Sequence, residues 1–179
     1  MNAGVLAAAG CAVFFALTFI TTKKLTARRR EALVDAIYAA AHVGMGEASV
    51  EEIDEINILR ASHLAMIRAI AALPLAPAHA LIDGNRLPAG LPCPGSAVVK
   101  GDGRSVSIAA ASIIAKVTRD RIMTELATAF PHYGWHTNAG YGSKLHMEAL
   151  KTHGITPHHR LSFAPVAAAA TISSSSESK

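Results

Sequence analysis

Two aspartates, each placed just after a short apolar run, are the residues of this 179-residue sequence best suited to chemistry. Asp83 follows the run His79–Ile82, and Asp102 lies 19 residues later, after Ala97–Val99 and a Lys-Gly pair. Both apolar runs predict short β-strands, and the Asp-Gly pair that ends the first one predicts a turn. Carboxylates at the ends of neighbouring strands can share a hard cation such as Mg²⁺ or Mn²⁺, which prefers oxygen ligands.

The reaction open to such a carboxylate pair is phosphodiester hydrolysis. There, two divalent ions about 4 Å apart activate the attacking water and stabilise the leaving oxygen. The spacing equally allows a simpler role, because aspartate side chains commonly cap the backbone of the turn in which they lie. On the residues alone, both interpretations stay open.

The elements that must position these aspartates alternate between helix and strand. A Ser49–Glu52 capping box predicts one short helix. Longer helices are predicted over residues 26–42, 57–73 and 107–130, and another short helix over 144–152. Strands that alternate with helices predict an α/β domain, and sites in open α/β sheets usually form where strands end.

Composition and charge narrow the class of protein. Apolar residues make up 51% of the chain and charged residues 17%, which predicts a folded, core-rich protein rather than a disordered one. A net charge of +4 slightly favours polyanionic partners. Cys11 and Cys93 form no metal-like spacing, and we expect reduced thiols in a cytoplasmic protein. The nine histidines show no metal-ligand spacing either, and His158-His159 before Arg160 predicts a basic surface patch.

Seven strings resemble bacterial ribonuclease HII, in order, from about residue 3 to residue 166. They are KKLTARRREAL (23–33), EIDEINILRASHLAM (52–66), LIDGNRLP (81–88), AVVKGD (97–102), IAAASIIAKVTRDR (108–121), AGYGSKLH (139–146) and HHRLSF (158–163). Any one string is weak, but seven in sequence are highly specific. The resemblance implies a ribonuclease H-like α/β fold, with a central mixed sheet flanked by helices and a small helical C-terminal part. We expect one domain over 1–166 and a disordered Ala- and Ser-rich tail over 167–179.

The same resemblance implies roles for individual residues. Asp83 and Asp102 match the third and fourth of the family's four catalytic, metal-binding carboxylates, with Mn²⁺ or Mg²⁺ as cofactor. Tyr141 matches a tyrosine that senses the 2′-hydroxyl at the RNA-to-DNA junction; without the resemblance it is a surface turn. Contacts with the substrate are implied for a further set of basic and amide side chains: Lys23, Lys24, Asn57, Asn85 and Lys100.

The sequence departs from the family at its beginning. The family begins with a strand that ends in a DEAGRG-like motif and supplies the first two carboxylates, and this sequence contains no such string. We therefore expect the first, central strand to be absent, through a wrongly chosen start codon or a truncated gene. Ala139 and Leu161 also stand where the family commonly has a lysine and an arginine.

The first twenty residues allow two interpretations. They carry no charged side chain and are followed by Lys23 and Lys24, a pattern also seen in membrane anchors. However, the stretch is rich in Ala and Gly and divides into Val5–Ala9 and Ala12–Ile20, which favours buried strands. Because the resemblance also favours strands, we expect no association with membranes. We also expect the protein to be a monomer.

The resemblance implies endonucleolytic hydrolysis of the RNA strand of RNA–DNA hybrids, including single ribonucleotides embedded in duplex DNA. Such a divalent-metal nuclease would cut on the 5′ side of the ribonucleotide and serve DNA replication and repair. An alternative is a catalytically inactive, truncated remnant that binds hybrid duplex without cutting it, because two of four carboxylates are absent. A membrane-anchored protein that uses residues 1–20 is a third, less favoured hypothesis.

Overall fold

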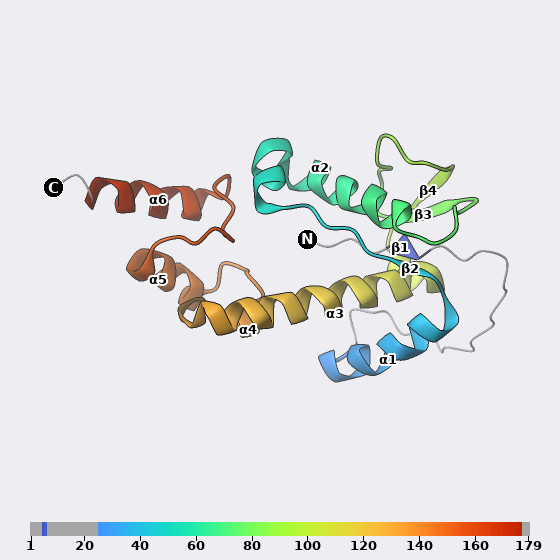
Figure 1. Ribbon diagram of the computed structural model, residues 1–179, viewed down its shortest axis with the longest axis horizontal. Coiled ribbons are helices and arrows are strands. Elements are labelled where there is room, and N and C mark those ends of the chain that lie inside the picture. The colour runs from blue at the N-terminus through green and yellow to red at the C-terminus, as the bar shows by residue number, and fades with distance from the viewer. Residues whose placement is uncertain (1–4, 7–24, 177–179) are drawn as a thin grey trace. The chain divides into compact units, whose positions relative to one another are not determined.

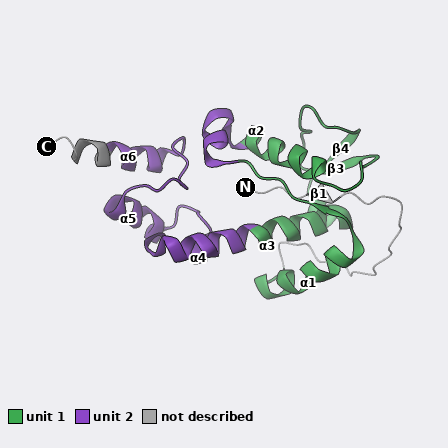
Figure 2. Cartoon of the chain, in the orientation of Figure 1, with its two compact units in different colours: residues 1–48, 59–118 green, residues 49–58, 119–179 purple. Residues whose placement is uncertain are grey.

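The computed structural model describes Val5–Leu6 and residues 25–176, and the side chains of residues 25–171 (Figure 1). The chain divides into two compact units (Figure 2). The first unit comprises residues 1–48 and 59–118, and the second unit comprises residues 49–58 and 119–179. The expected single domain over 1–166 stays a prediction.

Both described sheets lie in the first unit, and each has two strands. Strand β1 (Val5–Leu6) pairs antiparallel with β2 (Val43–Gly44), and β3 (Ala80–Asp83) pairs parallel with β4 (Gly95–Val98). The register of the parallel pair places Asp83 opposite Val98. The two predicted strands near the aspartates are therefore confirmed, with ends shifted by one or two residues.

The predicted helices are also present, with ends within a few residues of expectation. They are α1 (Ala27–Ala40), α2 (Val50–Ala71), α3 (Val106–Ala129) and α5 (Lys144–His153). The described residues also contain two helices that the sequence did not predict, α4 (Trp135–Asn138) and α6 (Ala164–Ser176), and the 3-10 turns η2 (Gly101–Gly103) and η3 (Pro131–Tyr133). The predicted capping box is confirmed, because the Ser49 N–H donates to Glu52 at 2.8 Å and the Glu52 N–H donates to the Ser49 hydroxyl at 3.2 Å. Helix α2 is two helices joined at Asn57, whose backbone is not helical, as the separate predicted helices require.

Helix α2 supports β3 in the first unit. Ala69 and Ile70 of the helix pack against Ala80 and Ile82 of the strand, and all four side chains are buried. A second cluster joins α1 to α3, where Val34 packs with four other buried side chains: Leu25, Ile113, Ile114 and Val117. These two clusters fix the strand end that carries Asp83 and the helix that follows Asp102.

Close packing explains a glycine between β2 and α2. A Cβ atom on Gly46 would lie 2.3 Å from the Ala65 carbonyl oxygen and 2.4 Å from the Ala69 nitrogen. Any side chain at this position would force the extended segment away from the helix.

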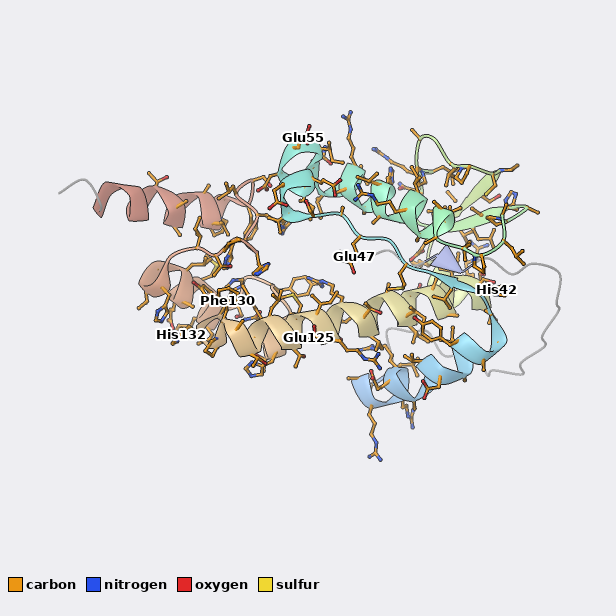
Figure 3. All side chains as sticks on the ribbon, in the orientation of Figure 1. His42, Glu47, Glu55, Glu125, Phe130 and His132 are labelled. Carbon is orange, nitrogen blue, oxygen red and sulfur yellow. The ribbon has the colours of Figure 1, made fainter. Side chains whose placement is uncertain are left out.

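The second unit is built around aromatic side chains. Trp135 is 1% exposed and stacks on Tyr133, with ring centroids 5.1 Å apart. Phe130, at the end of α3, packs against the Trp135 ring at 5.7 Å (Figure 3). The remaining buried members of this cluster come from α3, α5 and α6: Ala127, Ala149, Leu150, Val166 and Ala169.

Helix α6 occupies most of the segment expected to be a disordered tail. It runs from Ala164 to Ser176, and Val166 and Ala169 contribute buried side chains to the aromatic cluster. The physical reason is that an alanine run has high helix propensity and gains further stability once one face is buried. Low complexity alone therefore did not distinguish a tail from a docked helix.

No helix among the described residues is long and apolar enough to cross a bilayer. Apart from Val5–Leu6, the apolar stretch 1–20 lies outside the described residues, as do Lys23 and Lys24. The first predicted strand, Val5–Ala9, overlaps β1, whereas the second, Ala12–Ile20, is not described.

His159 corrects the expectation of a basic surface patch at His158-His159. Its side chain is 6% exposed and lies against the rings of Tyr133 and Trp135, with centroids 4.9 and 5.2 Å away. Burial, reinforced by the neighbouring His146 ring, lowers the pKa of His159 to about 4. The ring is therefore neutral at pH 7, and the basic group that the sequence predicts at this position does not exist.

This neutral histidine predicts a pH-dependent stability. An unfolded chain takes up a proton on His159 below pH about 6.5, whereas the folded chain does so only near pH 4. Stability is therefore full above pH 6.5 and declines as the pH falls toward 4, by about 3 kcal/mol in the free energy of unfolding. Urea unfolding followed by fluorescence of Trp135, the single tryptophan of the sequence, measures this decline.

The control is His159→Asn, because an amide oxygen can replace the Nδ1 acceptor but does not titrate in this range. We expect the variant to be less stable than the native chain at pH 7 and to lose less stability between pH 6.5 and 4. Equal losses in the two proteins would show that His159 does not cause the decline.

Candidate metal and substrate site

Asp83 is fixed at the end of β3 by a hydrogen bond to a distant turn. The Gly101 N–H donates to Asp83 Oδ1 at 2.8 Å, and the Gly84 N–H donates to the Val98 carbonyl at 3.1 Å. Side chains alternate along β3, so that Ile82 is buried while Asp83 is exposed. The strand thus anchors itself through its apolar face and presents a carboxylate that is already oriented.

Gly101 allows this approach because it has no side chain. A Cβ atom there would lie 2.5 Å from Ile108 Cδ1 and 3.3 Å from Asp83 Oδ1. Gly101 is buried between these two groups. A glycine in the AVVKGD string is therefore required by the close contact between the turn and Asp83.

The turn that carries Asp102 is compact and leads directly into α3. The Gly101 carbonyl accepts from the N–H groups of Arg104 at 3.0 Å and Ser105 at 2.8 Å. Asp102 lies in the middle of η2, next to the residue that binds Asp83, and is half-buried. The two candidate carboxylates therefore belong to one locality of the first unit, although their side chains come from different elements.

The substrate-binding candidates of the first unit lie beside this pair. Lys100 immediately precedes η2, and Asn85 follows the Asp83-Gly84 turn; both are exposed. An ammonium and an amide next to two carboxylates could contact a phosphate and a nucleotide edge. Their roles in binding stay predictions.

Among residues 25–171, no group of three or more histidine, cysteine, aspartate or glutamate side chains could hold a metal ion. Asp83 and Asp102 supply two hard oxygen donors, and Mg²⁺ commonly completes its shell with water and substrate phosphate. The donor chemistry thus fits a hard divalent cation, and metal binding by this pair stays a prediction.

Tyr141 lies in the second unit, where Arg119 holds its turn. Arg119 Nη2 donates to the Ala139 carbonyl at 2.8 Å and Nη1 donates to the Tyr141 hydroxyl at 3.4 Å. The guanidinium carbon lies 5.2 Å from the centroid of the Tyr141 ring, in a cation–π contact. The ring is 64% exposed, so its free face can meet a partner. Arg119 itself lies in helix α3, and the sequence did not predict its contact with this turn.

Unusual backbone conformations coincide with the candidate residues. Three non-glycine residues in the described part of the chain have positive φ: Asn57 at 66°, Lys100 at 55° and Ala139 at 47°. Asn57, which belongs to the second unit, combines this φ with a ψ of 163°, a region that is almost reserved for glycine. Two of the three are predicted substrate contacts, and the third precedes the Gly140–Gly142 turn.

Asp54 is a structural carboxylate that the sequence analysis missed. Its two oxygens accept hydrogen bonds from the N–H groups of Leu161 at 2.7 Å and Ser162 at 2.9 Å, and from the Ser162 hydroxyl. Desolvation of the carboxylate raises its pKa, but the hydrogen bonds outweigh this effect and hold the pKa of Asp54 below its usual value. The partners are more than 100 residues apart, so no local sequence pattern signals this contact.

Comparison with known proteins identifies relatives over most of the chain. The family described as Ribonuclease HII matches residues 3–166. Ribonuclease HII of Magnetococcus marinus is 63% identical over 81% of this chain and 69% of its own length. That of Ruegeria pomeroyi is 65% identical over 81% of this chain and 62% of its own length. The chain thus spans about two thirds of the length of these relatives.

Solved structures show the same fold. The ribonuclease H2 of Pyrococcus horikoshii aligns over 84% of this chain and 79% of its own, with a TM-score of 0.66 and 27% identity. The ribonuclease HII of Archaeoglobus fulgidus, solved in a complex with PCNA, aligns with a TM-score of 0.62 and 26% identity over 82% of this chain. The predicted α/β ribonuclease H-like fold is confirmed, as is the family that the seven strings predicted.

The strained Ala139 yields a prediction about stability. Ala139 ends α4 in the left-handed conformation, where glycine avoids the steric cost that alanine incurs. We expect Ala139→Gly to raise the free energy of unfolding by about 1 kcal/mol, because the Arg119 contact to this residue uses only its backbone. Urea denaturation measures the change.

The matched control is Ala149→Gly, the same substitution at a helical position of α5. It should destabilise the chain by about 1 kcal/mol or more, since glycine is a poor helix former and the alanine is buried. If Ala139→Gly destabilised the protein as Ala149→Gly does, the left-handed backbone at Ala139 would not be a source of strain.

Proposed function

Because this chain belongs to the ribonuclease HII family, we propose that it hydrolyses the RNA strand of RNA–DNA hybrids, including single ribonucleotides embedded in duplex DNA. The observation that carries the proposal is the hydrogen bond between Gly101 and Asp83. It joins the ends of two neighbouring strands, and thereby brings the two carboxylates of the family pattern into one locality. Members of this family are ribonuclease H hydrolases.

Asp83 and Asp102 are the proposed ligands of a divalent cation, Mn²⁺ or Mg²⁺. When bound, such an ion supplies activation of water and stabilisation of the leaving oxygen in phosphodiester hydrolysis. The chain contributes by holding Asp83 oriented through the Gly101 N–H, which binds Oδ1 of the carboxylate. Asp102, in the rigid η2 turn, is the second donor.

The substrate would be held by phosphate contacts and recognised at one nucleotide. Lys100 and Asn85 lie beside the carboxylates and are the proposed contacts of the first unit; Lys23 and Lys24 are proposed from the sequence alone. In the second unit, Asn57 is a further proposed contact. Tyr141 is the proposed sensor of the 2′-hydroxyl, the group that separates RNA from DNA at a single nucleotide.

A second candidate function is binding of hybrid duplex without cleavage. It is favoured by one observation: the described residues contain no third histidine, cysteine, aspartate or glutamate that forms a metal-binding group with Asp83 and Asp102. In either case we propose a cytoplasmic monomer that associates with hybrid duplex rather than with a membrane.

Cleavage of a duplex DNA that contains one ribonucleotide tests the proposal. Two forms would be assayed with Mn²⁺ and with Mg²⁺: the 179-residue chain, and the same chain preceded by a segment that carries the family's DEAGRG-like motif. We expect a single cut on the 5′ side of the ribonucleotide, at least in the extended form. Asp83→Asn should lower the rate by at least about a hundredfold. Substitution of a residue that only hydrogen-bonds to a metal ligand typically costs less than this.

Asp35→Asn is the matched control, because it removes the same charge from an exposed position of helix α1. It should leave the rate within about twofold of the native value, as is usual for surface substitutions. Binding without cleavage in both forms would favour the second candidate. Cleavage that survives Asp83→Asn would show that Asp83 is not a metal ligand.

A further inference from the structure

Two buried histidines lie behind the Tyr141 turn in the second unit. His146, in the first turn of α5, and His159 are each 6% exposed, and their Nε2 atoms are 3.1 Å apart. The rings of Tyr133 and Trp135 surround the pair. Polar groups buried this deeply require matched donors and acceptors, so their contacts determine which nitrogen of each ring carries a proton.

The contacts of His146 leave one tautomer. The indole N–H of Trp135 can only donate, and it lies 3.3 Å from His146 Nε2, which must therefore accept. The carbonyl oxygen of Tyr141 can only accept, and it lies 3.0 Å from His146 Nδ1, which must therefore carry the proton. His146 thus accepts at Nε2 and donates through Nδ1 to the backbone of Tyr141.

His159 has the opposite tautomer. The backbone N–H of Thr156 donates to His159 Nδ1 at 3.0 Å, so this nitrogen accepts. Its proton is then on Nε2 and points at His146 Nε2. Two donors, from Trp135 and His159, thus converge on one acceptor of His146, and the only nitrogen left to carry the His146 proton is the one that faces Tyr141.

We propose that His146 is a positioning residue for Tyr141, and that His159 sets the tautomer in which it does so. The Tyr141 carbonyl accepts from both His146 and the N–H of Ser143, at 3.0 and 2.8 Å. These bonds fix the backbone from which the Tyr141 ring projects, and Arg119 contacts the ring itself, which is still 64% exposed. A fixed ring avoids the ordering cost that a flexible turn would add on binding.

The inference rests on the proposed function in one respect: a fixed Tyr141 ring aids binding only if Tyr141 contacts the ribonucleotide. The positioning itself can be tested without nucleic acid. In chain labelled with ¹⁵N, nuclear magnetic resonance of the side chains should show the proton of His146 on Nδ1 and that of His159 on Nε2. The reverse tautomer of His146 would overturn the proposal, because Nδ1 would then be unable to donate to Tyr141.

Two amide substitutions separate the two sides of the ring. His146→Asn places an amide donor near the Nδ1 position and keeps a link to Tyr141, whereas His146→Gln places its amide near Nε2 and keeps only the links to Trp135 and His159. Both remove the same ring from the same core. A role in packing alone would therefore disturb the two variants alike.

The backbone N–H of Tyr141 and its glycine neighbours reports the result. We expect ¹⁵N relaxation to show a loss of order at Gly140–Gly142 in His146→Gln and near-native order in His146→Asn, at a temperature where circular dichroism shows both variants to be folded. Equal order in the two variants would overturn the proposal. If neither variant folds, the tautomers of the native chain decide it.

The functional consequence is a change in preference for ribonucleotides. Fluorescence anisotropy without divalent metal measures the affinity for duplex DNA with one ribonucleotide and the affinity for all-DNA duplex. The ratio of the first affinity to the second gives the preference. We expect His146→Gln to lower this ratio about fivefold, the worth of one buried hydrogen bond, and His146→Asn to lower it less. A native chain with an ordered turn but no preference would contradict the proposed function and leave the positioning role standing.

Discussion

The hydrogen bond from the Gly101 N–H to Asp83 is the interaction on which the candidate site depends. It joins the end of β3 to the turn after β4, and it requires a residue without a side chain, because Ile108 and Asp83 fill the space around Gly101. The bond orients one carboxylate and places the next residue, Asp102, beside it. A backbone donor to a carboxylate is a strong contact that needs no additional charged residue.

The position of Asp83 and Asp102 near the ends of neighbouring strands could be predicted from the sequence, because the two strands follow one another along the chain. Strands β3 and β4 follow one another and pair in parallel, so their ends meet at one edge. The shifted ends also have a physical reason. Strand β4 begins earlier than predicted because Gly95 pairs with Ala80 of β3. It ends at Val98, and the left-handed Lys100 closes the turn that follows.

The features that the sequence did not predict depend on contacts between distant residues. Asp54 binds the backbone at Leu161 and Ser162, and no periodicity connects positions so far apart. His159 looked like part of a basic surface patch, whereas burial beside Trp135 makes it neutral. In the same way, docking of α6 on the aromatic cluster is decided by packing rather than by composition.

The central claim is that Asp83 and Asp102 together bind a hard divalent cation. Titration of ¹⁵N-labelled chain with substoichiometric Mn²⁺ tests it directly, because the paramagnetic ion broadens the signals of nearby amides. The account predicts selective loss of the signals of Gly84, Gly101 and Asp102 in the native chain, and no such loss in Asp102→Asn. Broadening centred on another part of the chain, or broadening that persists unchanged in Asp102→Asn, would contradict it.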